Sequence, residues 1–160
     1  MNNVSATTIV HAPIARVWET IADVGTIAQW HPGVAKSPVL TPNHTGMGAS
    51  RQVELYDGST AVEQVTSLDE GRSLTVTMSE HTMPMSYAVV TFSVEADGNA
   101  RTRVTMSMEY KMKFGPVGWM LNTLMLRGIM NKLLPSTLAG LNHHLVTGET
   151  IGEGWAAEAA

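Results

Sequence analysis

The order of apolar and polar residues predicts one strand and two short helices at the start of the chain. Residues 4–11 alternate between the two kinds and are rich in Thr, Val and Ile, which is typical of a strand. Pro13 then occupies the first position of a helix whose apolar side chains return every three or four residues. Residues 26–30 predict a second short helix, which Pro32 and Gly33 end.

Between residues 34 and 113 the apolar side chains recur with period two, and turn-forming clusters separate the runs. The clearest run covers residues 103–113, where one face carries Val104, Met106, Met108, Tyr110 and Met112. The other face of that run carries Arg, Thr, Ser, Glu and Lys. This pattern predicts antiparallel strands joined by short turns, with one face of the sheet buried and the other in water.

The period changes to that of a helix after Gly115 and is kept to about His144. Its buried stripe is predicted to consist of Leu126, Ile129, Met130, Leu133, Thr137 and Leu141. Pro135 lies inside the stripe and should kink or interrupt the helix, because proline removes a backbone donor. A sheet with one buried face needs a cover, and this helix is the only predicted element long enough to provide it. If six or more strands curl around one helix, the concave side can enclose a cavity.

Length and composition indicate one globular domain. The 160 residues favour a single core, which we place at residues 1–146. Residues 147–160 are rich in Gly and Ala without a period, and we expect them to form a flexible tail. Hydrophobic residues make up 44% of the chain and charged residues 15%, which excludes a disordered protein. The net charge of −4 argues against a nucleic-acid partner.

Several kinds of chemistry and location are disfavoured by what the sequence lacks. It contains no cysteine, which excludes disulfides, thiolate metal sites and cysteine nucleophiles. The first ten residues have neither the basic nor the apolar segment of a signal peptide. Residues 114–134 are the most apolar stretch, but polar and charged side chains interrupt it, so we expect no stable membrane insertion. A cytoplasmic protein is the expectation.

The order of the predicted elements and several short motifs resemble the START-like superfamily, whose polyketide cyclase-type and Bet v 1-type members share the helix-grip fold. The resemblance covers about residues 3–146. The motifs that carry it are Ala12-Pro13, Val17-Trp18, Ala22-Asp23, Trp30-His31-Pro32-Gly33, Arg51, Val62-Glu63-Gln64-Val65 with Leu68-Asp69, the turn around Asp97-Gly98, and Leu138-Ala139-Gly140-Leu141.

This resemblance implies an α+β fold in which a curved antiparallel sheet of about seven strands wraps around the C-terminal helix. Two short helices follow the first strand, and an apolar pocket lies between sheet and helix. Members bind lipids, sterols, polyketides or other hydrophobic molecules, and a minority catalyse cyclisation or dehydration. Because no catalytic set is shared among them, the fold alone does not assign a reaction.

Arg51 and Glu63 are the first candidates for a functional role. In ligand-binding members similar to this chain, an arginine and a glutamate at the matching places project into the pocket as a polar anchor. Here each residue shares its strand face with apolar neighbours, and a buried charge is tolerated only when it is paired. The alternative is an ordinary cross-strand pair on the surface of the sheet.

Histidines and tyrosines supply the other polar candidates. The six histidines show no metal-ligand spacing, so we expect neither a metal nor another cofactor. His31 ends the second short helix and is either a general base near the pocket or a residue that caps the helix. Tyr110 lies on the apolar face of its strand, and its hydroxyl either enters the cavity or belongs to an ordinary core tyrosine.

The eleven methionines against two phenylalanines suggest a deformable pocket, because methionine adapts to irregular space. An apolar loop with Met83 and Met85 around Pro84 is a candidate lid. The residues predicted to bind ligand are Trp30, Arg51, Leu55, Glu63, Val65, Met78, Val90, Met106, Met108, Tyr110, Ile129, Met130 and Leu133.

Three functions fit these observations. The first is a module that binds, and either transports or sequesters, a small hydrophobic ligand such as a lipid or a polyketide-like molecule. The second is an enzyme similar to polyketide cyclases and dehydratases, acting on an aromatic or polyketide-derived substrate with Glu63, His31 or Tyr110 as its candidate catalytic residues. The third uses the apolar stretch 117–125 to associate with a partner or to form a homodimer.

Overall fold

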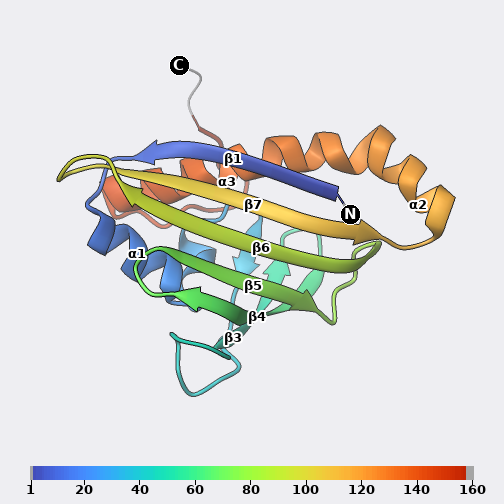
Figure 1. Ribbon diagram of the computed structural model, residues 1–160, viewed down its shortest axis with the longest axis horizontal. Helices are drawn as coiled ribbons and strands as arrows, with labels where there is room; N and C mark the ends of the chain where they lie inside the picture. The colour runs from blue at the N-terminus through green and yellow to red at the C-terminus, as the bar shows by residue number, and fades with distance from the viewer. Residues whose placement is uncertain (1, 158–160) are drawn as a thin grey trace.

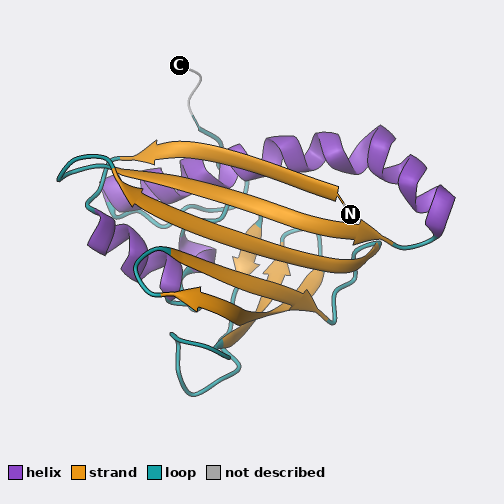
Figure 2. Cartoon of the chain, viewed as in Figure 1, coloured by secondary structure: helices purple, strands orange, loops and turns teal. Residues whose placement is uncertain are grey.

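The computed structural model describes residues 2–157, in which a strongly curved sheet is closed by one long helical segment (Figures 1 and 2). The elements follow the chain as β1 (Asn2–Val10), α1 (Ile14–Ala22), η1 (Ile27–Gln29), β2 (Val34–Lys36), β3 (Ser50–Leu55), β4 (Thr60–Asp69), β5 (Ser73–Ser79), β6 (Met85–Ala96), β7 (Thr102–Met112), α2 (Gly115–Leu121), the π-helical turn η2 (Asn122–Leu126) and α3 (Arg127–Thr147). The predicted α+β helix-grip fold is confirmed, including two short helices after the first strand.

The seven strands form one antiparallel sheet in the order β1-β7-β6-β5-β4-β3-β2. Strands β2 to β7 are each paired with their neighbours along the chain, and β1 joins the free edge of β7. Because α1 and η1 connect β1 at one edge with β2 at the other, they lie across the open side of the curled sheet (Figure 1). The open side is thus closed by short helices at one end and by the C-terminal helix along its length.

The concave face of the sheet is apolar because the strands alternate strictly. In β7 every even-numbered residue from Thr102 to Met112 is buried, and the odd-numbered residues lie partly or fully in water. Met106 stands opposite Phe92 of β6 and Ala6 of β1, so the register aligns apolar side chains across three strands. The predicted division of the sheet into a buried face and a wet face follows directly from this register.

The C-terminal helix packs its buried stripe against this concave face. The stripe of α3 consists of Met130, Leu134, Thr137, Leu138, Leu141 and Leu145. The predicted interruption at Pro135 is wrong, because α3 continues through it from Arg127 to Thr147. Pro135 is exposed, so the carbonyl that loses its donor, at residue 131, meets solvent and not a dry core.

A π-helical turn joins α2 to α3 and keeps one set of side chains inward. The inward residues Gly118, Asn122, Leu126, Met130 and Leu134 are spaced by four. In an α-helix a step of four residues overshoots one full turn by roughly 40°. The wider turn at 122–126 offsets this drift, so that α2 and α3 present a continuous inward stripe.

Helix α3 ends at Thr147, and the domain boundary expected after residue 146 stays a prediction. The segment after it makes defined contacts, although the sequence predicts a flexible tail. The Ile151 amide donates to the Gln29 carbonyl (3.0 Å), and the Ile151 side chain is buried. The Trp155 ring lies 5.3 Å from the His143 ring. Residues 158–160 of the predicted tail lie outside the described residues.

Gly140 allows α3 to approach the end of η1 closely. A Cβ atom at this position would lie 2.2 Å from the Trp30 carbonyl oxygen and 2.9 Å from Ile151 Cδ1. The carbonyl belongs to the backbone and cannot swing away. The approach of the helix to the short η1 turn, and with it the position of Trp30, therefore depends on the absence of a side chain at residue 140.

We expect Gly140→Ala to lower the free energy of unfolding by about 1–3 kcal/mol, because the added methyl forces α3 away from η1. Gly128→Ala is the matched control in the same helix, since a Cβ there meets nothing within 4 Å. Its higher helix propensity should raise stability by up to about 1 kcal/mol. Urea unfolding of both variants checks this, and equal effects of the two substitutions would contradict it.

Candidate functional site

A cavity of about 120 Å³ lies between the concave face of the sheet and the first half of α3. Strands β3 to β7 supply most of its wall, and Met130, Leu133 and Leu134 of α3 supply the opposite side. Ile27, Val34 and the His31–Gly33 turn contribute the end near η1.

Methionine dominates the flexible part of this wall. Five of the residues that line the cavity are methionines, namely Met78, Met83, Met106, Met108 and Met130. Met83 belongs to the β5–β6 connection and is only partly buried, as Leu133 of α3 is. Unbranched thioether side chains can change rotamer with little strain, so the wall can yield to a larger occupant.

Arg51 and Glu63 form a buried ion pair at the cavity wall. They stand directly opposite each other on β3 and β4, and only 3% and 8% of their surfaces are exposed. Arg51 Nε donates to Glu63 Oε2 at 2.7 Å, and Arg51 NH2 contacts the same oxygen at 2.6 Å. Both residues line the cavity, where nearly all their neighbours are apolar.

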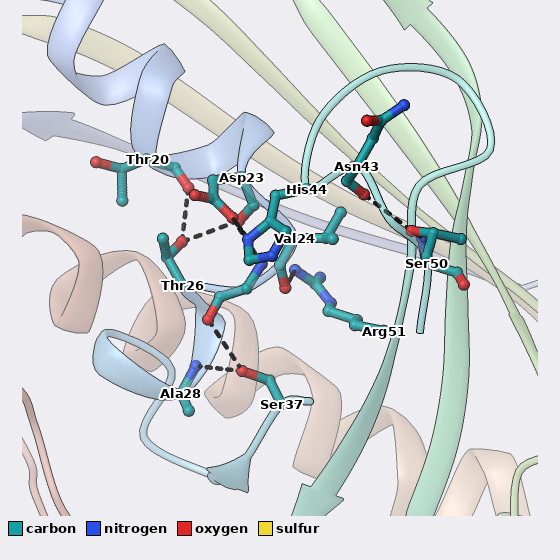
Figure 3. Close-up of polar contacts among 12 residues, drawn as sticks. Thr20, Asp23, Val24, Thr26, Ala28, Ser37, Asn43, His44, Ser50 and Arg51 are labelled. Carbon is teal, nitrogen blue, oxygen red and sulfur yellow. Dashed lines mark hydrogen bonds and ion pairs between the residues drawn. The ribbon is translucent and has the colours of Figure 1, made fainter. Parts of the chain in front are cut away.

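Arg51 also reaches beyond the sheet to the loop that follows α1. Its NH1 donates to the carbonyl of Val24 at 3.2 Å, and Figure 3 shows the guanidinium directed at that residue. Val24 is buried, so its carbonyl needs a donor within the protein. The arginine therefore satisfies a loop carbonyl and a carboxylate at the same time.

Polar contacts hold this loop in place (Figure 3). Asp23 Oδ1 accepts the Gly25 amide at 2.8 Å and lies 3.3 Å from His44 Nδ1. Thr26 Oγ1 donates to the Thr20 carbonyl at 2.7 Å. Val24 in turn donates its amide to the His44 carbonyl at 2.8 Å. The loop that receives Arg51 is thus tied to α1 and to the connection between β2 and β3.

His31 lies on the cavity wall with both ring nitrogens occupied. Nδ1 accepts the Gly33 amide at 3.0 Å, and Nε2 lies 3.3 Å from Thr137 Oγ1 on α3. Because Nδ1 accepts, the proton of the neutral ring is on Nε2 and is donated to Thr137. Burial lowers the pKa of His31 to about 4, with the nearby Glu63 opposing this shift and Arg51 adding to it.

The sequence predicts Tyr110 on the cavity wall, but the structure places it elsewhere in the core. Its hydroxyl donates to Asn122 Oδ1 of the π turn, and the Asn122 amide donates to Asn2 Oδ1 at 2.9 Å. Burial raises the pKa of the Tyr110 hydroxyl, with a smaller opposing effect of Arg127. This tyrosine joins β7, β1 and the helix, and it is not part of the cavity wall.

Nine of the thirteen predicted ligand-binding residues lie on the cavity wall: Arg51, Leu55, Glu63, Met78, Val90, Met106, Met108, Met130 and Leu133. That they bind a ligand stays a prediction. Besides Tyr110, three predicted residues lie elsewhere. Trp30 packs behind the wall, with its ring edge-on to Phe92 at 5.9 Å, and Val65 is buried in the core. Ile129 is 53% exposed, because it stands one residue outside the buried stripe that begins at Met130.

Several wall residues are not among the sequence candidates. Val76 and Phe92 share a strand face with the predicted Met78 and Val90, so the period-two pattern already contains the signal. Ala61 shares its face with Glu63 in the same way. Ile27, Val34 and Leu134 come from other elements, and only the three-dimensional closure brings them to the cavity.

Solved structures with the same fold include three informative examples. A protein of Thermus thermophilus superposes with a TM-score of 0.76 at 18% identity, covering 92% of this chain and 99% of its own. A START superfamily protein of Mycobacterium smegmatis superposes with a TM-score of 0.70 at 18% identity, covering 89% of this chain and 98% of its own. A Thalictrum norcoclaurine synthase superposes with a TM-score of 0.68 at 16% identity, covering 92% of this chain and 95% of its own. At these identities the likeness shows the fold alone.

Comparison of the sequence with known families assigns the chain to one of them. No curated protein matches it. Residues 1–145 match the family described as "Polyketide cyclase / dehydrase and lipid transport". This match spans the whole sheet and nearly all of α3, and it agrees with the START-like fold of the superposed structures. The chain therefore belongs to the polyketide cyclase / dehydrase and lipid transport family.

Proposed function

We propose that the protein binds a small hydrophobic molecule, such as a lipid or a polyketide-like compound, in this cavity and transports or sequesters it. The observation that carries the proposal is the ion pair of Arg51 and Glu63 in an otherwise apolar wall. A buried ion pair contributes little net stability compared with well-packed apolar residues. In a ligand site, a few polar groups fix the orientation of an apolar molecule. The cytoplasmic location expected from the sequence belongs to the same proposal.

The pair also favours one kind of polar group on the ligand. Both Arg51 contacts fall on Glu63 Oε2, and Oε1 accepts no hydrogen bond from residues 2–157. A ligand hydroxyl can donate to this oxygen, whereas a ligand carboxylate would bring a second negative charge to it. We therefore infer an apolar ligand with a neutral hydroxyl, such as a phenol or an alcohol.

The small volume of the cavity limits which ligands it can hold without movement of its wall. Typical pockets for drug-sized ligands have volumes of about 300–1,000 Å³, well above the cavity described here. A compound of one aromatic ring fits the present volume, whereas a longer lipid or polyketide requires the methionine side chains of the wall to move. The five methionines make such a rearrangement compatible with the fold.

The second candidate is a cyclase- or dehydratase-like enzyme acting on an aromatic or polyketide-derived substrate. It is favoured by the free Oε1 of Glu63, which can accept a proton from a substrate in the cavity. The other two candidate catalytic residues are less suited, because both ring nitrogens of His31 are occupied and Tyr110 lies outside the cavity wall. The family description itself includes both cyclases and lipid transport.

Binding of small probes tests the proposed function. We expect isothermal titration to show that 4-propylphenol binds at least about tenfold more tightly than 4-propylbenzoate, given the strength of a hydrogen bond to a charged acceptor. Ala61→Leu should abolish binding, because three added carbons occupy the cavity. Ala15→Leu, on the exposed face of α1, is the matched control and should bind normally. Equal binding by both variants would contradict a ligand in this cavity.

Unfolding of the ion-pair variants separates stability from function. Arg51→Met leaves Glu63 buried without its partner and should cost about 3–5 kcal/mol of unfolding free energy. The double variant Arg51→Met/Glu63→Leu should recover part of this loss, because neither charge remains buried, although the Val24 carbonyl still lacks its donor. The folded double variant should also lose its preference for the phenol over the benzoate. A double variant as unstable as Arg51→Met would show that the pair is kept for stability.

The lowered pKa of His31 predicts a specific dependence of stability on pH. The folded protein favours the neutral ring, so the contribution of His31 is complete above pH 6.5 and is lost as the pH falls towards 4. His31→Asn keeps an acceptor for the Gly33 amide but cannot titrate. Relative to this variant, urea unfolding should show wild type losing about 1.4 kcal/mol per pH unit over that range. Parallel pH profiles of the two proteins would contradict the assignment.

A further inference from the structure

The helical segment before the cavity wall exposes an unusual amount of apolar surface. We call residues Phe114–Ile129, which comprise α2, the π turn and the start of α3, the apolar arm. Of the thirteen large apolar side chains exposed among residues 2–157, eight belong to it: Phe114, Val117, Trp119, Met120, Leu121, Leu124, Met125 and Ile129. Trp119 is 67% exposed and Leu124 74%. In Figure 1, α2 projects past the ends of the strands.

The inner side of the arm is already fixed, so its outer side cannot turn into the core. Asn122 is held between Tyr110 and Asn2 by hydrogen bonds. A Cβ atom on Gly118 would lie 1.8 Å from the Lys113 carbonyl oxygen, which shows how closely the arm meets the end of β7. Val117, Leu121, Leu124, Met125 and Ile129 recur on the other side at three- and four-residue spacing. They form a stripe that needs a cover from outside the domain.

The charges within the arm and next to it in the sequence, from residue 110 to 148, all have one sign. Lys111, Lys113, Arg127 and Lys132 are exposed, and they make up four of the ten Lys and Arg residues of the chain. No Asp or Glu occurs between residues 110 and 148, although the whole chain has a net charge of −4. The ion pairs among residues 2–157 leave these four cations without a carboxylate partner. The surface that fits the arm is therefore both apolar and negatively charged.

We propose that the apolar arm docks the protein on the surface of a lipid bilayer with anionic headgroups. Exposed Leu, Met and Trp side chains beside Lys and Arg are typical of helices that lie in the membrane interface. Trp119 has the amphipathic ring that settles at the headgroup level. A second copy of the chain fits less well, because a symmetric contact through the arm would bring like charges together. No helix in residues 2–157 is long and apolar enough to cross a bilayer, so the contact is at the surface.

Docking in this orientation brings the cavity near the lipid. Met130 and Leu133, which line the cavity, follow the arm directly on the same helix. Leu133 is only partly buried, so this stretch of the wall that follows the arm is not fully covered. The docking proposal stands on the arm and its charges and does not depend on ligand binding in the cavity.

Vesicle sedimentation of the full chain tests the proposal. We expect binding to phosphatidylcholine vesicles that contain about one-third phosphatidylserine, and much weaker binding to pure phosphatidylcholine. Raising the ionic strength from about 0.1 M to about 1 M should weaken binding, because it shortens the screening length from roughly 10 Å to 3 Å. Lys113→Gln/Arg127→Gln should lower the partition constant roughly fivefold for each cation removed. Trp119→Ser/Leu124→Ser should lower it by at least about tenfold.

Matched variants elsewhere on the surface control for general effects. Leu40→Ser/Val146→Ser removes two apolar side chains outside the arm that are 52% and 55% exposed, and Lys36→Gln/Arg72→Gln removes two exposed cations. Both should bind vesicles as wild type does. Equal losses from arm and control variants would overturn the proposal, as would wild-type binding that ignores phosphatidylserine. A dimer in analytical ultracentrifugation that the arm variants abolish, with no vesicle binding, would assign the arm to a second copy.

Discussion

A sheet that curls around a single helix encloses more space than the side chains of that helix can fill. The concave face here is drawn from strands β3 to β7, but only the stripe from Met130 to Leu145 faces it from α3. The short helix α1 and the η1 turn close one end of the opening, and Gly140 allows α3 to reach them. The remaining space becomes the cavity. Its existence thus follows from the topology, and the residue types on its wall decide what it accepts.

The wall combines two kinds of side chain that behave differently. Arg51 and Glu63 are held by several hydrogen bonds and by strand pairing, so their positions are well defined. The methionines lack such partners and adapt to their surroundings. In the proposed function, a site built in this way orients one polar group of the ligand and tolerates variation in its apolar remainder. That combination suits a family whose description extends from polyketides to lipids.

The sequence predicts the fold and much of the cavity because its strands alternate so regularly. Met106 and Met108 can be placed on the inner face from period two alone, and Arg51 and Glu63 from the resemblance. Other features depend on contacts between residues far apart in the sequence, which no local pattern of residues reveals. His31 meets Thr137 across 106 positions of sequence, and the Trp30 ring packs edge-on against Phe92 without lining the cavity. The prediction for Ile129 is wrong because only the packed helix defines where the stripe from Met130 begins.

The close approach of Gly140 to the Trp30 carbonyl makes one end of the cavity wall less able to move than the other. The Trp30 ring packs edge-on against Phe92 and its carbonyl meets the helix, so this end of the wall has little room to move. Met130 lies ten residues earlier on α3, roughly 15 Å along the helix axis, and there methionines and a partly open rim form the wall. The wall can therefore move more easily at the end near Met83 and Met130 than at the end near Trp30.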